Sequence, residues 1–409
     1  MTATNSGRRD GGEAAERHAS PIGLWLNGAR GSVAVTAITG LLALRDGLAP
    51  PTGCVTDHPP LNRAPLTQWA DIAIGGHDIV DTPLEKRVET LVDNGVIPPP
   101  VLSAVRGAVG AVESELRIGY DPATHTGSQA DAVDRLAADI ADFRSRHRVD
   151  RVVVVNVAST EAPFPRCPEH DDIDALKAAV SRPGRLTLPA SSVVAYAAFL
   201  AGCGFVDFTP STGARLPALA ALAERQAVPF AGSDGKTGQT LVRTALAPMF
   251  AARALRVRSW AGVNLLGGGD GATLEDPATA RSKLDSKAGV LRALLGEDVQ
   301  APLHINNVPD LGDHKTAWDH VSFEGFLGVR MSMHLVWSGV DSSLAAPLVL
   351  DLTRLVAAAH ADGRHGPIPE LAFFFKDPIG TTEHALATQS RMLTDWAATL
   401  GAGRRTDRP

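Results

Sequence analysis

The sequence predicts an α/β protein with a parallel sheet covered on both faces and a smaller second domain with a different pattern of apolar and polar residues. Short, uninterrupted apolar runs alternate with helical patterns, and the clearest of these runs is Arg151 to Val157. Such strands are typical of parallel sheets buried between helices. Beyond about Thr240 the pattern changes to longer strands with alternating polarity, which indicates a second sheet. A chain of 409 residues is long enough for two cores.

The first element is expected at Ile22 to Asn27, a short apolar run that predicts a strand. Gly28-Ala29-Arg30-Gly31 follows, and a helical pattern then continues to Leu44. A second strand is expected from Asp71 to Ile74, leading into Gly75-Gly76, and a helix from Ser128 to His147 precedes the run at Arg151. Further α/β elements are expected at Ser191 to Leu200, Phe205 to Phe208, Leu216 to Gln226 and Val228 to Ala231.

The second domain is expected to contain two pairs of strands. The first pair covers Arg256 to Asn264 and Ala301 to Asn307, and the second pair covers Val321 to Gly328 and Arg330 to Trp337. The alternating pattern of the second pair is typical of antiparallel strands at a domain or subunit interface. A long apolar helix, Leu344 to Ala359, is then expected to return to the first domain.

Composition and charge exclude several classes of protein. The formal net charge of −6 leaves no basic stripe, so nucleic acid is not an expected partner. Three scattered cysteines argue against a disulfide framework and for a reducing, cytoplasmic compartment. No signal peptide or membrane span is expected, and residues 1–20 and 401–409 have the composition of disordered tails.

The first glycine turn is an incomplete dinucleotide fingerprint. Gly28 and Gly31 fit the second and third places of G-x-G-x-x-G, but Leu26 stands at the first. Small residues let backbone amides at a helix N-terminus approach a pyrophosphate, although a plain tight turn fits the same letters. An acidic ribose partner is expected further on, and Asp78 at the end of the next strand is a better candidate than Asp57.

Two other motif-like segments are weaker. Gly235-Lys236-Thr237 is not a P-loop, because Phe230 stands where the first glycine is needed; a helix N-terminus capped by Ser233 or Asp234 is expected instead. Cys167-Pro168-Glu169-His170 and the pair His360 and His365 lack a second ligand pair at zinc-site spacing. No metal site is predicted.

Four lysines stand in unusual settings. Lys283 and Lys287 share one face of a predicted helix, Lys315 follows Gly312-Asp313-His314, and Lys376 follows an apolar run, Ala372 to Phe375, that predicts a strand. A lysine at the end of an apolar strand is expected to be partly desolvated, which strengthens its electrostatic effect and lowers its pKa. Four such cations around one pocket would suit a phosphate and transient oxyanions.

Taken together, the motifs resemble those of the myo-inositol-1-phosphate synthase family in order and spacing over roughly residues 21 to 395. The matching segments are Gly75-Gly76-His77-Asp78-Ile79, Val157-Ala158-Ser159-Thr160-Glu161, Gly232-Ser233-Asp234-Gly235-Lys236-Thr237-Gly238-Gln239-Thr240, Asn264-Leu265-Leu266-Gly267-Gly268-Gly269-Asp270-Gly271, Arg281-Ser282-Lys283 to Lys287, Gly312-Asp313-His314-Lys315 and Asp341-Ser342-Ser343-Leu344-Ala345-Ala346-Pro347-Leu348. Lys376 stands where the family has its last active-site lysine.

The resemblance implies a Rossmann-type NAD-binding domain, residues 21–245 and 336–400, with an inserted catalytic and oligomerisation domain, residues 246–335, commonly in a homotetramer. It also implies NAD as cofactor and glucose 6-phosphate as substrate. The C5 hydroxyl is oxidised, C6 is enolised and attacks the C1 aldehyde, and C5 is reduced again to give myo-inositol phosphate.

The same resemblance assigns roles to individual residues. Lys283 would take the hydroxyl proton, Lys376 and Lys315 would stabilise the oxyanions, and Asp234, Asp270 and Asp313 would orient the lysines. The phosphate would be held by Lys287 with backbone amides and hydroxyls near Ser211, Thr212 and Thr240, and Lys236 and Gln239 would also bind the substrate. The cofactor would be bound by Gly28, Ala29, Arg30, Gly31, Ser32, Asp78, Ala158, Ser159, Thr160, Asp234, Gly267, Asp270, Asp341 and Ser342.

The chain departs from the family pattern at Ser159, Gly268 and Gly269, where the family has asparagines. Each change removes an amide that could bond a sugar hydroxyl or the cofactor. A relative that cyclises another hexose phosphate, such as fructose 6-phosphate to a five-membered ring, is therefore an alternative. A catalytically silent NAD-binding regulator and a plain dehydrogenase are two further alternatives.

Overall fold

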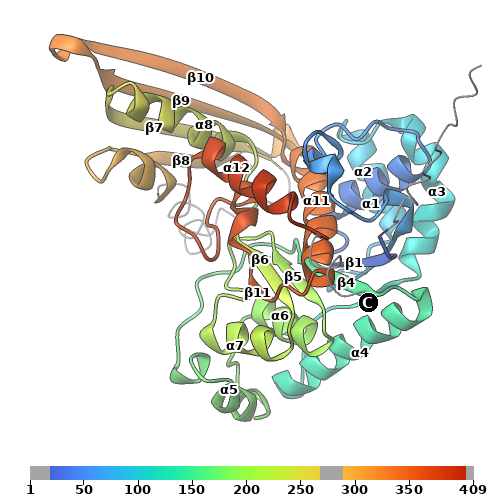
Figure 1. Cartoon of the computed structure of the whole chain (residues 1–409). Helices are drawn as coiled ribbons and strands as arrows, with labels where there is room; N and C mark the ends of the chain where they lie inside the picture. Colours follow the sequence, from blue (N-terminus) through green and yellow to red (C-terminus); the bar gives the residue numbers. More distant parts are fainter. Residues whose placement is uncertain (1–18, 268–288, 402–409) are drawn as a thin grey trace, which may run out of the picture.

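The computed structural model describes residues 19–267 and 289–401 and shows two sheets side by side (Figure 1). The larger sheet has seven strands in the order β11-β6-β5-β4-β1-β2-β3. All its neighbours pair in parallel. Its strands are β1 (Ile22–Asn27), β2 (Ile72–Asp78), β3 (Leu116–Ile118), β4 (Arg151–Asn156), β5 (Gly204–Asp207), β6 (Pro229–Gly232) and β11 (Gly366–Pro367). This confirms the predicted α/β class.

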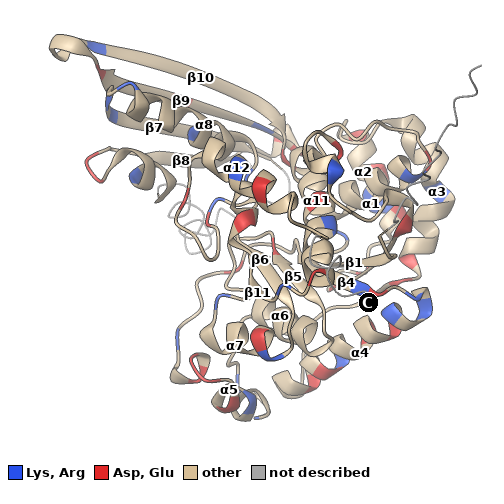
Figure 2. Ribbon diagram, viewed as in Figure 1, with Lys and Arg blue, Asp and Glu red and all other residues tan. Residues whose placement is uncertain are grey.

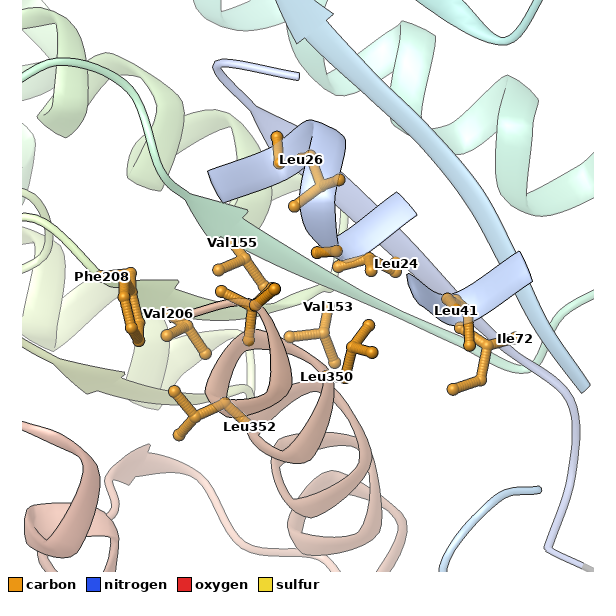
Figure 3. Close-up of a cluster of buried hydrophobic side chains, with 14 of the residues drawn as sticks. Leu24, Leu26, Leu41, Ile72, Val153, Val155, Val206, Phe208, Leu350 and Leu352 are labelled. Carbon is orange, nitrogen blue, oxygen red and sulfur yellow. The ribbon is translucent and has the colours of Figure 1, made fainter. Parts of the chain in front are cut away.

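Helices cover both faces of this sheet, as the uninterrupted apolar strands require. The helices of the first domain are α1 (Ser32–Arg45), α2 (Leu84–Asp93), α3 (Pro99–Glu113), α4 (Gln129–His147), α5 (Ile173–Val180), α6 (Ala190–Leu200) and α7 (Pro217–Arg225). On β4, Val153 and Val155 face the cluster that includes α1 and α11 (Asp341–Ala361), whereas Val152 and Val154 face α4 and α6. Figure 3 shows Leu350 and Leu352 of α11 against Val153, Val155 and Val206.

The returning helix α11 is a core element of the first domain. It spans Asp341–Ala361, three residues earlier and two residues later than the predicted Leu344 to Ala359. Its length and hydropathy are those of a membrane span, but 67% of its most apolar window is buried in the protein. It packs against α1 and against β4, β5 and β6, which explains its apolar composition without a bilayer.

The smaller sheet has four strands in the order β10-β9-β7-β8. They are β7 (Arg256–Leu266), β8 (Leu303–Asn307), β9 (His314–Glu324) and β10 (Arg330–Val340), and β9 pairs antiparallel with both β7 and β10. The long helix α8 (Gly238–Ala252) packs on it through Ala247 and Phe250. The predicted domain boundaries at 245/246 and 335/336 thus lie inside α8 and inside β10.

Two local predictions were wrong. The strand predicted at Val321 to Gly328 begins seven residues earlier, at His314, and the chain turns at Phe326–Gly328. The strand predicted at Ala372 to Phe375 lies mostly in a 3₁₀ helix, Pro369–Phe374. Proline at the start of that helix fixes its φ, and the aromatic residues that followed suit a buried turn as well as a strand. A last helix, α12 (Leu386–Ala397), packs against this 3₁₀ helix and α8.

Candidate functional site

The carboxyl edge of the large sheet has a topological switch point between β1 and β4. The chain runs outward from β1 through β2 to β3 on one side, and from β4 through β5 to β6 on the other. In open α/β sheets, ligands bind in the crevice at such a point. The strand ends are joined there, because the Asn27 amide nitrogen donates to the Asn156 side-chain oxygen over 2.8 Å.

The predicted glycine turn lies at this crevice. Gly28 has a φ of +86°, and a Cβ at this position would lie 2.7 Å from the Cα of Ala158. The backbone N–H groups of Gly28 and Ala29 both donate to the His77 carbonyl at the end of β2. Only glycine combines this backbone conformation with so close an approach to the neighbouring loop. The turn therefore needs Gly28 for structural reasons in addition to any ligand.

Beyond the turn, α1 presents an uncapped N-terminus. Its N-cap, Gly31, has no side chain, and its first turn, starting at Ser32, holds no acidic residue. Asp78 accepts from the backbone N–H of Arg30 over 2.6 Å and from that of Val80 over 2.9 Å. Asp78 thus fixes the turn beside the N-terminus of α1. The unsatisfied N–H groups of that N-terminus favour a bound anion.

Arg30 contributes to this site through its backbone. Its guanidinium forms an ion pair with Glu113 at the end of α3, and its backbone N–H donates to Asp78. The cofactor-binding role of Arg30 stays a prediction.

Sequence reasoning missed an apolar patch beside Asp78. Ile79 is 62% exposed, Val80 49% and Ile118, at the end of β3, 78%. The Gly119 N–H donates to the Asp78 carbonyl, which holds the two strand ends together. Large apolar side chains exposed beside a carboxylate that is predicted to bind ribose suit a flat aromatic base. The Ile79 in the G-G-H-D-I segment was the available signal.

These features fit NAD. The Gly28 turn and the N-terminus of α1 would hold its pyrophosphate, and Asp78 has lone pairs for ribose hydroxyls. Ala158, Ser159 and Thr160 follow β4 directly across the crevice. The hydroxyl of Ser342 is buried and has no hydrogen-bond partner among the described residues, so it can take a ligand polar group.

A buried acidic cluster lies at the ends of β4 and β5. One oxygen of Asp207 accepts from Asn156 and Thr209, while its other oxygen has no partner among the described residues. Burial raises the pKa of Asp207 to about 7. Burial also raises the pKa of Glu161, whose carboxylate accepts from the backbone N–H and hydroxyl of Ser191.

Ser211 and Thr212, predicted to hold a phosphate, lie in the loop next to this cluster. The Ser211 hydroxyl accepts from the Glu161 N–H over 3.1 Å. Ser211 is buried, whereas Thr212 is half-buried. Within the part of the chain that the structure describes, no contact joins them to Thr240, the other predicted phosphate ligand.

Lys376 forms a buried ion pair with Asp234. Its Nζ lies 2.6 Å from an Asp234 oxygen, and both side chains are nearly inaccessible to solvent, at 8% and 4% exposed. Their backbones are also bonded, since the Lys376 N–H donates to the Asp234 carbonyl over 2.7 Å. Asp234 therefore contacts one of the four lysines that were predicted to form the site.

Lys315, at the start of β9, pairs with Asp341, which is not among the three carboxylates expected to orient the lysines. Its Nζ lies 2.7 Å from Asp341, the first residue of α11, and the other Asp341 oxygen accepts from the Thr237 hydroxyl over 3.1 Å. Asp313 instead accepts from the Asn94 amide at the end of α2. Asp313 therefore orients the loop before β9, and Asp341 orients the lysine.

The two ion pairs are anchored at opposite ends of one short segment, Asp234 to Thr237. Three Cα–Cα steps of 3.8 Å limit its span to about 11 Å. This segment follows β6 directly and leads into α8, so it joins the carboxyl edge of the large sheet to the small sheet. Lys376 and Lys315 are thus brought together by elements 61 residues apart in the sequence.

The N-terminus of α8 completes the described part of the site. A Cβ at Gly238 would lie 3.9 Å from Lys315 Nζ, so this ammonium group lies close to the first turn of the helix. The buried hydroxyl of Thr240 has no partner among the described residues. The N-cap is Thr237, without a side-chain cap, so the predicted cap at Ser233 or Asp234 was wrong.

Gln239 and Lys236 have side-chain partners inside the protein. The Gln239 amide donates to Asp319 and accepts from Asn264. The Lys236 ammonium group donates to Gln389 on α12. Both were predicted as substrate-binding residues; Gln239 anchors α8 to β7 and β9, and Lys236 points towards the C-terminal helix.

Several predicted residues lie outside the described part of the chain, namely Gly268, Gly269, Asp270, Lys283 and Lys287. Gly267, which directly follows β7, is described and buried. A Cβ at Gly267 would lie 2.3 Å from the carbonyl oxygen of Gly312. This close contact brings the end of β7 against the loop that carries Asp313. Among the described residues, no cluster of three metal-ligating side chains occurs.

The comparisons with known proteins agree with this architecture. An NAD-binding family model described as myo-inositol-1-phosphate synthase matches residues 22–398. The chain belongs to the myo-inositol-1-phosphate synthase family. It is 33% identical over 405 residues to inositol-3-phosphate synthase 1 of Bacteroides thetaiotaomicron, covering 91% of this chain and 94% of that one.

Solved structures of this family share the fold. An inositol-3-phosphate synthase from Caenorhabditis elegans superposes with a TM-score of 0.82 at 22% identity, covering 95% of this chain and 89% of that chain. A myo-inositol-1-phosphate synthase-related protein from Thermotoga maritima gives 0.76 at 24% identity, covering 92% and 98%.

Membership of the myo-inositol-1-phosphate synthase family identifies the chain as an enzyme, a sugar-phosphate cyclase that uses NAD. The curated relatives are inositol-3-phosphate synthases. They do not favour the alternative of a cyclase for another hexose phosphate.

Proposed function

We propose that this enzyme converts glucose 6-phosphate to myo-inositol phosphate without net redox change. The observation that best supports this proposal is the pair of lysines: Lys376 pairs with Asp234 at one end of the Asp234–Thr237 segment, and Lys315 pairs with Asp341, whose carboxylate accepts from Thr237 at the other end. Bound NAD would supply hydride chemistry, accepting a hydride from C5 and returning it at the end. All other steps need proton transfers and stabilised oxygen anions, which side chains can provide.

The protein groups have distinct tasks in this scheme. A base takes the C5 hydroxyl proton as the hydride leaves, and the resulting ketone acidifies the hydrogens at C6. After one C6 proton is removed, the C6–C1 bond forms and the C1 oxygen takes a proton. Lys376 and Lys315 would stabilise the negative charge on the C5 and C1 oxygens, because preorganised cations in a buried site act strongly on developing charge. Lys283 stays the predicted base, with Asp270 orienting it.

The substrate phosphate would bind at the N-terminus of α8. The helix has 15 residues, no acidic residue in its first turn and no side-chain cap. The ammonium group of Lys315 lies beside that turn, and the Thr240 hydroxyl has no partner among the described residues. Helix N-terminus, cation and hydroxyl together favour a dianion. Lys287 stays a predicted additional phosphate ligand.

The test is incubation with NAD and glucose 6-phosphate, followed by phosphorus NMR of the product and absorbance of reduced nicotinamide. The expected result is a cyclitol phosphate, identified against authentic inositol phosphates, with no accumulation of reduced cofactor. Reduced cofactor formed in proportion to an oxidised open-chain product would instead show a plain dehydrogenase. Absence of any turnover with NAD bound would support a silent regulator and contradict the proposal.

We also propose a homotetramer that uses the outer face of the small sheet. On this face Trp318 of β9 lies between Val263 of β7 and Val336 of β10, and β10 carries no charged residue after Arg330 (Figure 2). Val336 is 71% exposed and Trp318 39%. Exposed apolar strands without charges suit an interface between copies.

Analytical ultracentrifugation of a Val336→Asp variant tests this interface. The variant is expected to dissociate to smaller species. A matched control is Leu186→Asp, because Leu186 is 57% exposed and lies in the first domain. The control is expected to keep the wild-type assembly. A wild-type protein that sediments as a monomer would refute the tetramer.

A further inference from the structure

Lys236 is a buried cation that takes no part in either ion pair of the site. The residue is 3% exposed, and its ammonium group donates to the side-chain oxygen of Gln389 on α12. The Phe373 ring lies 6.0 Å from the ammonium group. Within the described part of the chain, no carboxylate lies at ion-pair distance from it. Its position in the segment between Asp234 and Thr237 is nevertheless central to the site.

The backbone around Lys236 is paired with the chain that carries Lys376. The Lys236 N–H donates to the Phe374 carbonyl over 2.8 Å, and the Lys376 N–H donates to the Asp234 carbonyl over 2.7 Å. Ser233 and Asp377 exchange two backbone bonds, of 2.9 and 3.2 Å. These bonds form a short antiparallel ladder. The position of Lys376 therefore depends on how firmly this ladder is held.

The side chain of Lys236 connects this ladder to the segment that follows Asp377, through Gln389. After Asp377 the chain runs through residues 378–385 into α12, which carries Gln389. The Gln389 amide nitrogen donates to the Glu383 carbonyl over 2.6 Å. The Gln389 side chain thus links Lys236, which precedes α8, to the loop that follows Lys376.

A cation in this place is costly, which argues against a purely stabilising role. Burial lowers the pKa of Lys236 to about 7. Burial also lowers the pKa of His384 in the same loop, and the positive charge of Lys236 lowers it further, against the opposing effects of Asp377 and Glu383. A buried ammonium group with a neutral acceptor is less stable than a well-packed apolar side chain of the same size.

We infer that Lys236 is a positioning residue: through Gln389 it clamps the 377–385 loop so that Lys376 stays on Asp234 in the catalytic geometry. This inference rests on the proposed function of Lys376. It replaces direct contact of Lys236 with substrate, because the ammonium group is directed at α12 and is already bonded there. The chemistry requires only a donor on residue 236 and an acceptor on residue 389.

A double-mutant cycle with Lys236→Met, Gln389→Met and the combined variant tests this role. Lys236→Met leaves the Gln389 oxygen buried without its donor, whereas the double variant replaces both polar groups by an apolar pair of similar size. We expect kcat of Lys236→Met to fall about tenfold or more with KM changed less than about twofold, and kcat of the double variant to fall no further than that of the worse single variant, because both substitutions break the same link from Lys236 to the Glu383 carbonyl. Lys177→Met, on the exposed face of α5, is the control and should match wild type.

Hydrogen exchange supplies a readout that needs no turnover. Residues 377–389 should exchange faster in Lys236→Met and stay fast in the double variant, which also lacks the bond from residue 389 to the Glu383 carbonyl. A raised KM of Lys236→Met at unchanged kcat would show substrate contact, and unchanged kcat with lowered stability would show a merely structural lysine; either result overturns the inference. Failure of the wild type to form a cyclitol phosphate would refute the proposed function alone, because exchange still reports on the clamp.

Discussion

Removing Lys376 should affect both turnover and folding, and the two effects can be separated. The Lys376–Asp234 pair is closed at 2.6 Å with side chains that are 8% and 4% exposed. Substitution of Lys376 by methionine keeps the volume but leaves the Asp234 carboxylate without this cation in a buried place. Breaking one side of a buried pair costs about 3–5 kcal/mol. We therefore expect a lowered unfolding temperature, by roughly 5 °C or more.

The double variant Asp234→Asn/Lys376→Met removes both charges together. Exchange of a whole buried pair for neutral groups is often close to neutral in stability, so most of the lost unfolding temperature should return. Turnover should not return, because the cation that stabilises the oxyanion is still absent. The loss of one such group typically lowers kcat by about 10²–10³. Stability and activity thus move apart between the two variants.

Thermal unfolding and steady-state cyclisation of the three proteins measure these effects. NAD binding by calorimetry is the control for Lys376→Met and should stay within about threefold of wild type. Two results would refute the reasoning. Lys376→Met that unfolds at the wild-type temperature would show that the ion pair is not buried as described. A double variant that turns over at the wild-type rate would remove Lys376 from the chemistry.

Three further predictions follow from other parts of the site. The free energy of unfolding of Asp207→Asn, measured in urea, should rise relative to that of wild type by about 2–3 kcal/mol between pH 5 and pH 8. The reason is that the pKa of Asp207 is raised to about 7, so the folded wild type must bury a new charge over that range. A difference between the two free energies that does not change with pH would contradict this. Gly28→Ala should weaken NAD binding at least about tenfold, since its Cβ would lie 2.7 Å from the Ala158 backbone; unchanged calorimetric affinity would exclude the turn as part of the cofactor site. Asp341→Asn should lower kcat about tenfold or more, whereas Asp313→Asn should change it less than about threefold, because Asp341 contacts Lys315 and Asp313 contacts Asn94. The reverse order would refute Asp341 as the residue that orients Lys315.

The fold was largely predictable because its signals are local. Continuous apolar runs at Ile22 to Asn27 and Arg151 to Val157 identified β1 and β4, and the apolar pattern after Leu344 identified α11. Strands buried on both faces must be apolar throughout, so composition alone reveals them. The aromatic run before Lys376 gave a wrong strand, because a buried 3₁₀ turn needs the same residues.

The pairing of side chains at the site was less predictable. Asp313 is one of three carboxylates that were expected to orient the lysines, but it accepts from Asn94, and the partner of Lys315 lies elsewhere. The true partner, Asp341, is 26 residues away and lies on another element. The cap of α8 was also predicted wrongly, because the chain pairs with the Phe374 segment as far as Lys236 before the helix begins.

The arrangement explains why the active-site segment lies between the two sheets. Asp234 to Thr237 leaves the carboxyl edge of the large sheet at β6 and becomes α8, which packs on the small sheet. Any relative shift of the sheets would move the Lys315–Asp341 pair, where β9 and β10 meet the start of α11, relative to the Lys376–Asp234 pair, which follows β6, because the two pairs lie at different sheets. The lysine geometry therefore depends on the domain interface, and a mutation that loosens the interface should lower kcat before it weakens NAD binding at the distant Gly28 turn.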